Sequence, residues 1–136
     1  MKKNGLKSKY INALGRRKRS VARIRLFSGK GQFLVNSKPI EDYFKNIPTV
    51  KYFKPFELTD TIGKFFATAR ITGGGINGQV GAFVLGVSRA FSKLDAEKYR
   101  KILKPHGLLT RDPREKERRK FGLAQGARAA KQSPKR

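Results

Sequence analysis

Apolar and polar residues alternate with a period of two in two stretches of the chain. Residues 21–27 place Ala22, Ile24 and Leu26 on one face and two arginines, Arg23 and Arg25, on the other. Residues 64–72 (KFFATARIT) alternate in the same way. A period of two is typical of a strand with one buried face. We therefore predict a strand in each stretch, and a weaker one over residues 9–14 before the basic turn GRRKRS.

Turn-forming residues follow the first of these strands. Residues 28–31 (SGKG) include types that favour a turn, and residues 32–35 have a strand-like sequence again. This order predicts a β-hairpin. The spacing of Ile40, Tyr43 and Phe44 predicts one or two helical turns. Residues 47–62 are expected to form a short helix and a connecting loop.

The clearest helical pattern comes after the glycine-rich start of TGGGINGQVGAFVL. Apolar residues recur at i, i+3, i+4 and i+7 from Ile76 to Leu94, which predicts an amphipathic helix. Asp95 is the expected N-cap of a second helix, which Pro105 and Gly107 end. Along the chain, the predicted strands of the first part are followed by the strand over residues 64–72 and then by two helices. This order predicts the α+β class, with a layer of sheet against a layer of helices.

The charge of the chain is strongly positive and lies mostly at its ends. The chain has 33 Lys and Arg and 9 Asp and Glu, which gives a net charge of +24 and a pI near 11.1. Residues 1–25 hold ten bases and no acid, and thirteen bases but only three acids follow from residue 100 onward. Such an excess predicts a polyanionic partner, foremost nucleic acid.

The same composition divides the chain into three parts. Residues 1–8 are a basic N-terminal extension, residues 9–109 a globular α+β domain, and residues 110–136 an extended basic tail. In the tail, Phe121 and Leu123 are the only large apolar residues. They are too few to offset the entropy of ordering the segment, so the tail is expected to need its partner to acquire a shape.

Several classes of function are not supported by the residue types. The chain has no cysteine and a single histidine, His106, so we expect no metal site or cofactor. No positioned base and nucleophile can be nominated, and the adjacent Glu41 and Asp42 fit a solvated helix face. Apolar runs fall far short of about 20 residues, and residues 1–15 have no apolar core of a signal peptide. We predict no enzyme and no membrane partner.

The glycine-rich segment resembles a nucleotide-binding loop but lacks its other parts. Gly73, Gly75 and Gly78 fit G-x-G-x-x-G, yet Asp95, near the position of the acidic residue that a dinucleotide site needs at the end of a second strand, opens a helix instead. A P-loop would need Lys and Ser or Thr where Gln79 and Val80 stand. Two interpretations stay open: a tight strand-to-helix turn, or bare amides at a helix N-terminus that bind a backbone phosphate of nucleic acid.

Small residues also form a stripe along the helix that follows. Gly78, Ala82 and Gly86 are spaced by four and lead to Arg89 and Lys93. A helical glycine costs about 1 kcal/mol relative to alanine. Close approach of another surface would compensate for that cost, and the surface is either the sheet or RNA.

Four segments together resemble one family, the universal small-subunit ribosomal protein nine. They are GRRKRSVARIRL, TDTIGKF, TGGGINGQVGAFVLGVSRAF and LLTRDPREKERRKFGL, and the resemblance covers nearly the whole chain. It implies a small mixed sheet of about four strands with helices on one face, a left-handed β-α-β crossover and a long extended basic C-terminal tail. It also implies a structural constituent of the small ribosomal subunit, bound to small-subunit rRNA and to neighbouring proteins in the subunit head. The location would be cytoplasmic, and an organellar ribosome also stays open.

The resemblance further implies that the last two residues approach the tRNA in the peptidyl site. Lys135 and Arg136 match that end, although the chain closes on AKQSPKR, with Pro134 before Lys135, where bacterial members commonly have Gln-Phe-Ser-Lys-Arg. The candidate rRNA-binding residues are cations, three glycines and one glutamine, most of them within these segments: Arg16, Arg17, Lys18, Arg19, Arg23, Arg25, Gly73, Gly74, Gly75, Gln79, Arg89, Lys93, Arg111, Arg114, Arg118, Arg119, Lys120, Arg128 and Lys131.

Overall fold

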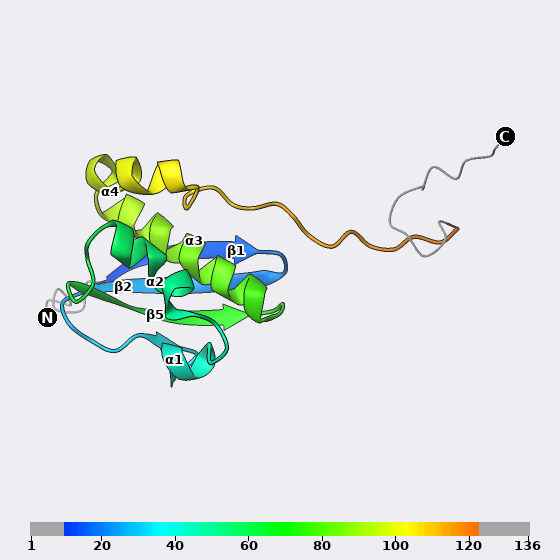
Figure 1. The fold of residues 1–136 in the computed structure, drawn as a ribbon, viewed down its shortest axis with the longest axis horizontal. Helices are drawn as coiled ribbons and strands as arrows, with labels where there is room; N and C mark the ends of the chain where they lie inside the picture. Colours follow the sequence, from blue (N-terminus) through cyan, green and yellow to red (C-terminus); the bar gives the residue numbers. More distant parts are fainter. Residues whose placement is uncertain (1–9, 123–136) are drawn as a thin grey trace, which may run out of the picture.

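A computed structural model describes residues 10–122, which form a five-stranded sheet with helices on one face (Figure 1). The strand order is β1-β2-β5-β3-β4. β1 pairs antiparallel with β2, β2 antiparallel with β5, and β3 parallel with β5, so the α+β class and the mixed sheet are confirmed, with five strands rather than about four. The strands are β1 (Tyr10–Arg17), β2 (Ser20–Ser28), β3 (Leu34–Val35), β4 (Lys38–Pro39) and β5 (Phe65–Thr72).

The turn predicted in the basic segment GRRKRS is present but is limited to two residues, because the rest of the segment is strand. β1 continues to Arg17, which pairs with Ser20, and only Lys18 and Arg19 connect the two strands. Lys18 has a φ of 53°, the left-handed conformation that a tight two-residue hairpin turn requires. The antiparallel ladder therefore runs to the end of the hairpin. We call residues 16–19 the hairpin tip.

The predicted hairpin between residues 21–27 and 32–35 is wrong. β5 lies beside β2, with eight pairs in register from Val21–Thr72 to Ser28–Phe65. β3 is only two residues long and pairs with the far side of β5. An eight-residue ladder between two half-buried strands buries far more apolar surface than a short local hairpin, so the long-range pairing overrides the turn signal.

The helices agree with the sequence prediction. Asp95 caps α4, since its Oδ1 accepts from the backbone N–H of Lys98 at 3.2 Å. Gly107 follows with a φ of 72° and ends the helical chain. The helical elements are α1 (Ile40–Tyr43), α2 (Thr49–Leu58), α3 (Ile76–Leu94), α4 (Ala96–Leu103) and a 3-10 turn, Lys104–His106.

The core lies between the sheet and the helices. The alternate residues of β2 and β5 that were predicted to face inward are buried: Ala22, Ile24, Leu26, Ala67, Ala69 and Ile71. Aromatic side chains fill the space toward α2 and α4, with Phe91 5.3 Å from Phe56 between ring centroids. Phe91 also meets Phe65 edge to face at 5.6 Å, a favoured arrangement of rings.

The stripe of small residues on α3 packs against the sheet. A Cβ at Gly86 would overlap the side chain of Ile24, and a Cβ at Gly15 would overlap the carbonyl oxygen of Ala82. Gly78 lies close to Ser20 in the same way. Of the two surfaces that the sequence left open, the sheet is thus the one that compensates for the helical glycines.

The chain leaves the body after the 3-10 turn. Leu108 and Leu109 still pack against the core, and the described residues beyond them form no helix or strand. In Figure 1 this segment runs away from the sheet and the helices. Within residues 10–122 no helix has the length and apolar character to cross a membrane.

Candidate nucleic-acid interface

The glycine turn between β5 and α3 lies directly on the hairpin tip. Gly73 and Gly74 have φ values of +78° and +66°, which favour glycine. A Cβ at Gly74 would overlap the hydroxyl oxygen of Ser20, and one at Gly73 would lie 2.6 Å from the carbonyl oxygen of Arg19. The Ser20 hydroxyl donates to the Gly73 carbonyl at 2.9 Å. These two glycines therefore pack the turn against the hairpin tip, which agrees with the interpretation of the segment as a tight strand-to-helix turn.

Gly75 differs from its two neighbours. Its φ is −98°, and a Cβ added there would meet nothing within 4 Å. It is the N-cap of α3, and no side chain caps that helix end. A hollow beside it is lined by Lys18, Lys45, Asn77 and one acid, Asp42. Amides at a helix N-terminus and two lysines are an arrangement that favours an anion.

Gln79 is engaged inside the protein by both ends of its amide. Its Oε1 accepts from the Tyr43 hydroxyl at 2.8 Å, and its Nε2 donates to the Gly73 carbonyl at 3.2 Å. Gln79 therefore positions the turn. A direct contact of this side chain with RNA stays a prediction.

The four cations of the hairpin tip point in different directions. Arg16, Lys18 and Arg19 are exposed, and Arg17 is partly buried. Two of them meet acids of the tail: Arg17 lies 3.4 Å from Asp112 and Arg19 lies 3.5 Å from Glu115. The tip thus holds the start of the tail at one end of the body.

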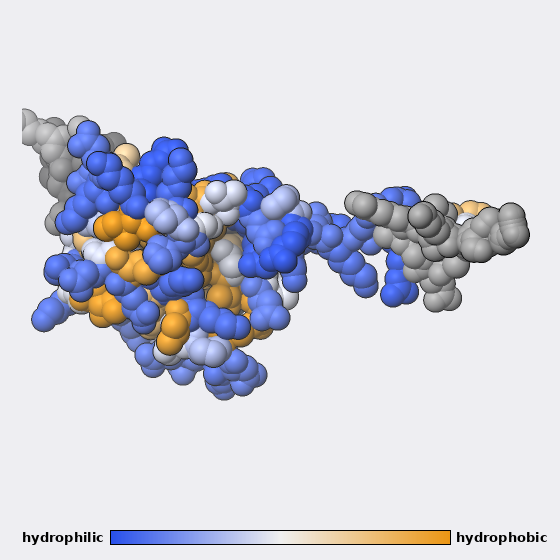
Figure 2. All heavy atoms as spheres, turned by 45° about the horizontal axis from the view of Figure 1, so that its top comes forward, coloured by the Kyte–Doolittle hydropathy of each residue, from blue (hydrophilic) through white to orange (hydrophobic). Residues whose placement is uncertain are grey.

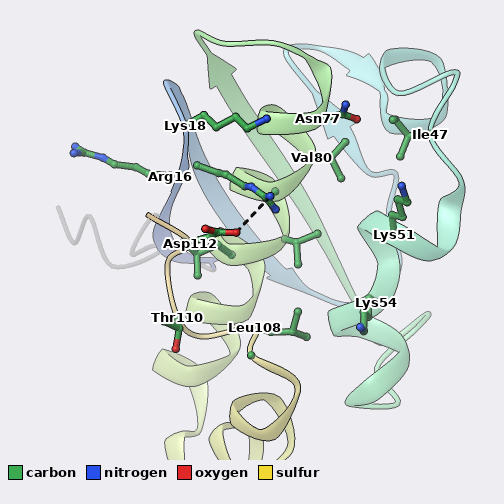
Figure 3. A pocket seen from close by; sticks show the side chains of 15 residues that line it. Arg16, Lys18, Ile47, Lys51, Lys54, Asn77, Val80, Leu108, Thr110 and Asp112 are labelled. Carbon is green, nitrogen blue, oxygen red and sulfur yellow. Dashed lines mark ion pairs between the residues drawn. The ribbon is translucent and has the colours of Figure 1, made fainter. Parts of the chain in front are cut away.

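A cleft of about 640 Å³ opens beside the tip (Figure 3). Arg17 and Lys18 line one side, and Lys51 and Lys54 of α2 line the other. Val80 of α3 and Leu108, just after the 3-10 turn, add apolar surface to it, whereas Arg16 points away from it in Figure 3. Cations on both sides and an apolar lining suit a sugar-phosphate strand.

The sequence analysis missed Lys51 and Lys54. Their spacing of three on a predicted helix was a usable signal, because such residues share a face. Which way that face points depends on the packing of α2 against α3. No local pattern encodes that packing.

Asp112, near the start of the tail, forms ion pairs with two arginines, Arg17 and Arg114. Arg114 donates to its carboxylate from Nε at 2.9 Å and from Nη2 at 2.6 Å, and the backbone N–H of Arg114 donates at 2.9 Å. These bonds, with the charge of Arg17 nearby, lower the pKa of Asp112 from 3.8 to about 2. The same pair raises the pKa of Arg114. Lys120 and Glu117 form a second pair at 2.8 Å, so part of the tail charge is engaged in ion pairs within the tail.

Arg89 and Lys93 bind the outer edge of the sheet. Arg89 donates to the carbonyl of Leu14 at 2.9 Å, and Lys93 donates to the carbonyl of Asn12 at 2.8 Å. β1 is an edge strand, so these bonds satisfy backbone acceptors that have no neighbouring strand. Both side chains keep their charge at the surface.

The other candidates lie on two further surfaces. Arg23 and Arg25 are exposed on the face of the sheet opposite α3. Arg70, which pairs with Arg23 in register, was not among the predicted residues. Exposed cations give the tail the hydrophilic surface seen in Figure 2. Among them are the predicted Arg111, Arg114, Arg118 and Arg119, while Lys120 is half-buried.

Some predictions concern residues outside the described part. They are the N-terminal extension, residues 1–8, and the cations Arg128, Lys131, Lys135 and Arg136. Within residues 10–122, no group of three His, Cys, Asp or Glu side chains could hold a metal ion.

The sequence matches a family model described as ribosomal protein S9/S16 over residues 15–136. The chain belongs to this family. The small ribosomal subunit protein uS9 of Thermotoga neapolitana is 50% identical over 119 residues, which cover 85% of this chain and 88% of that protein. The protein of the same name from Dehalococcoides mccartyi is 47% identical over 131 residues, which cover 96% and 98% of the two chains.

Membership of this family decides between the classes of function. Its members are structural proteins of the small ribosomal subunit and not enzymes, so this chain is a structural ribosomal protein. Translation, a ribonucleoprotein environment and rRNA binding follow from the family. The glycine segment therefore serves no nucleotide-dependent reaction.

Proposed function

We propose that this protein binds small-subunit rRNA in the head of the subunit through the hairpin tip, the cleft and the tail. One observation carries the proposal: these three cationic surfaces meet at one end of the body. The Arg17–Asp112 ion pair joins the tip to the tail, and Lys18 lines both the cleft and the hollow at the start of α3. A single folded RNA can therefore contact all of them at once.

The proposed contacts with rRNA are of two kinds. Exposed arginines of the tip and tail bind phosphates through paired N–H donors, a geometry that lysine does not provide. Gly75 and the first amides of α3 bind a phosphate through the backbone, while Gly73, Gly74 and Gln79 hold the turn in place. The proposed phosphate-binding cations are Arg16, Arg17, Lys18, Arg19, Arg23, Arg25, Arg89, Lys93, Arg111, Arg114, Arg118, Arg119, Lys120, Arg128 and Lys131.

We also propose that the C-terminal end of the tail reaches the peptidyl-site tRNA. Lys135 and Arg136 would hold phosphates of the anticodon stem by charge and hydrogen bonds, which positions the tRNA without a chemical step. About 14 residues separate Gly122 from the end of the chain, and extended chain spans about 3.3 Å per residue or more. Reach of this order supports a contact far from the body, in a ribosome in the cytoplasm next to other proteins of the head.

The connection from β3 to β5 is proposed to be the left-handed crossover of the family. β3 and β5 are parallel neighbours, and the chain between them passes through β4, α1 and α2. Nearly all such connections are right-handed, so a left-handed one is unusual. An experimental structure in which this connection is right-handed would refute this part of the proposal.

Salt dependence of rRNA binding tests the role of the hairpin tip. Replacing Arg16, Arg17 and Arg19 with Gln should weaken binding and lower the slope of log K against log salt by about 2 to 3, since each phosphate contact contributes about 0.9. The matched control replaces Arg100, Lys101 and Lys104 near α4, which lies away from the tip (Figure 1). An equal loss in both variants would contradict the assignment and indicate unspecific attraction.

Ribosomes with an altered tail end test the tRNA contact. The double variant Lys135→Gln and Arg136→Gln keeps the chain length and removes two charges. We expect normal subunit assembly and weaker tRNA binding in the peptidyl site, measured by filter binding with purified subunits. Unchanged tRNA affinity would refute the contact and leave rRNA binding standing.

A further inference from the structure

Among residues 10–122, no helix covers one face of the sheet. β1, β2 and β5 bury Ala22, Ile24 and Ala69 beneath α3, so the residues between them point to the opposite side. We call that side of β1, β2 and β5 the open face. Arg23, Arg25 and Arg70 lie on it and are exposed.

The strand registers bring these three arginines together. Arg23 lies directly opposite Arg70, and Arg25 is two residues from Arg23 along β2. A hollow of about 300 Å³ lies among them, and Leu34, Asn36 and Thr68 also line it. Like charges directly opposite each other on a sheet are destabilising. The hollow is therefore a place where the protein concentrates positive charge at a cost to its own stability.

The chain offers no acidic side chain to neutralise this charge. All nine Asp and Glu lie between residues 41 and 117, and none belongs to β1, β2 or β5. The four ion pairs of residues 10–122 leave out Arg23, Arg25 and Arg70. Residues 1–9 and 123–136 contain no Asp or Glu at all. These exposed arginines are therefore available to an anion from outside the chain.

An aromatic row borders the arginines on the open face. Tyr10, Phe27 and Phe66 are in register on the three strands, and all are half-buried. Phe27 and Phe66 stack on each other with centroids 4.9 Å apart and planes 8° from parallel, and Gly31 lies against the Phe66 ring. Both faces of Phe66 are therefore covered, and Tyr10 is the other end of the row. The centroids of the Tyr10 and Phe27 rings are 5.3 Å apart, and the guanidinium of Arg25 lies 5.2 Å from the centre of the Tyr10 ring.

This combination favours a particular form of RNA. Bases that are not paired in a helix can stack on aromatic rings and on the planes of arginine guanidinium groups, while the phosphates beside them bind cations. A duplex keeps its base faces covered and would use the arginines alone. Rings and arginines in adjacent rows therefore fit single-stranded RNA better than a duplex.

We propose that the open face binds a single-stranded segment of the RNA, with phosphates at Arg23, Arg25 and Arg70 and a base against Tyr10 at the end of the aromatic row. The inference deepens the proposed function and rests on it. It adds Arg70 and Tyr10 to the interface, while Phe27 and Phe66 support the Tyr10 ring. These residues lie outside the hairpin tip, the cleft and the tail.

Binding of short RNAs by the full chain tests this proposal. The probes are a 12-nucleotide uridine oligomer and a 12-base-pair RNA duplex. The variant Arg23→Gln, Arg25→Gln and Arg70→Gln should lower the salt slope for the oligomer by about 2, since each contact with a single strand contributes about 0.7. The variant Arg100→Gln, Lys101→Gln and Lys104→Gln is the charge-matched control and should keep the slope.

A second variant separates stacking from charge. Tyr10→Leu keeps every charge and an apolar side chain, and it should weaken oligomer binding about fivefold while duplex binding stays the same. Circular dichroism checks that each variant is folded. If Tyr10→Leu weakens the binding of oligomer and duplex equally, the single-strand assignment is wrong.

Cross-linking within whole small subunits identifies the molecule on the open face. A photoreactive residue at Thr68, beside Arg25 in the register, should form an adduct with rRNA. An adduct with a neighbouring protein instead would overturn the proposal. If the unaltered protein binds no rRNA, the proposed function fails with it; if it binds and the open-face variants bind equally well, only this inference fails.

Discussion

At the scale of single residues, three successive glycines serve two different purposes. Gly73 and Gly74 adopt positive φ angles and touch the hairpin tip, whereas Gly75 is open and caps α3. The motif G-x-G-x-x-G cannot distinguish these purposes, because it records only the identity of the residues. The backbone conformation and the neighbouring Ser20 hydroxyl distinguish them.

A glycine-to-alanine pair measures the close approach at the turn. Gly74→Ala should destabilise the protein by about 1 to 3 kcal/mol more than Gly63→Ala, because of overpacking. Gly63 also has a positive φ, +82°, but a Cβ there meets nothing within 4 Å, so it carries the cost of conformation alone. Urea unfolding of both variants measures the difference, and equal stabilities would show that the Ser20 contact is unimportant.

The depressed pKa of Asp112 makes the attachment of the tail sensitive to acid. A carboxyl group whose folded pKa is about 2, against an ordinary 3.8, stabilises the folded state above about pH 4. That contribution is lost as the pH falls toward 2, because both states then bind the proton. The Arg17–Asp112 contact should accordingly persist at neutral pH and loosen in this acidic range.

Carboxyl NMR shifts recorded against pH check the Asp112 prediction. The Asp112 resonance should titrate with a midpoint near 2, and Arg114→Gln should move the midpoint upward toward 3.8. Arg17→Gln should move it less, because the hydrogen bonds from Arg114 are the larger cause. A midpoint that Arg114→Gln leaves in place would contradict this explanation.

At the scale of elements, the contact of α3 with β1 and β2 determines the layer spacing. Gly15 on β1 meets the backbone of Ala82 and Gly86, and Gly86 meets Ile24 on β2. Backbone atoms cannot move aside as a flexible side chain can. The helix can therefore lie this close to the sheet only while both positions lack a side chain.

Gly15→Ala tests this spacing. The added methyl group would force α3 away from β1 and should cost about 1 to 3 kcal/mol or more. Asn12→Ala, at an exposed position of the same strand, is the matched control and should change stability by no more than about 0.5 kcal/mol. Thermal unfolding compares the two, and a stable Gly15→Ala protein would show that the layers can separate without loss.

The same scale shows what the sequence could and could not predict about the fold. Residues 21–27, 64–72 and 76–94 have clear periodicity, and their strands and helix were predicted correctly. The place of residues 34–35 was not, since two residues carry no periodicity and their partner, β5, lies about 30 positions further on. Register between distant strands depends on total burial, which a local turn signal does not contain.

At the scale of the whole molecule, charge distribution was the most informative property of the sequence. It indicated a polyanionic partner and selected most of the candidate cations without any knowledge of the fold. Lys51 and Arg70 were missed because each lies in a segment of ordinary composition, and only folding places it beside other cations. The four motif segments identified the family, which no property of charge alone could do.

The borders of the sheet determine how the protein behaves before it meets RNA. On one border, Arg89 and Lys93 occupy carbonyl groups of β1; on the other, β4 has two residues, one of them Pro39, whose nitrogen has no hydrogen to donate. Amyloid-like growth needs a long free strand as its template. Both borders of the sheet are therefore poor templates for edge-to-edge pairing between two copies of the chain.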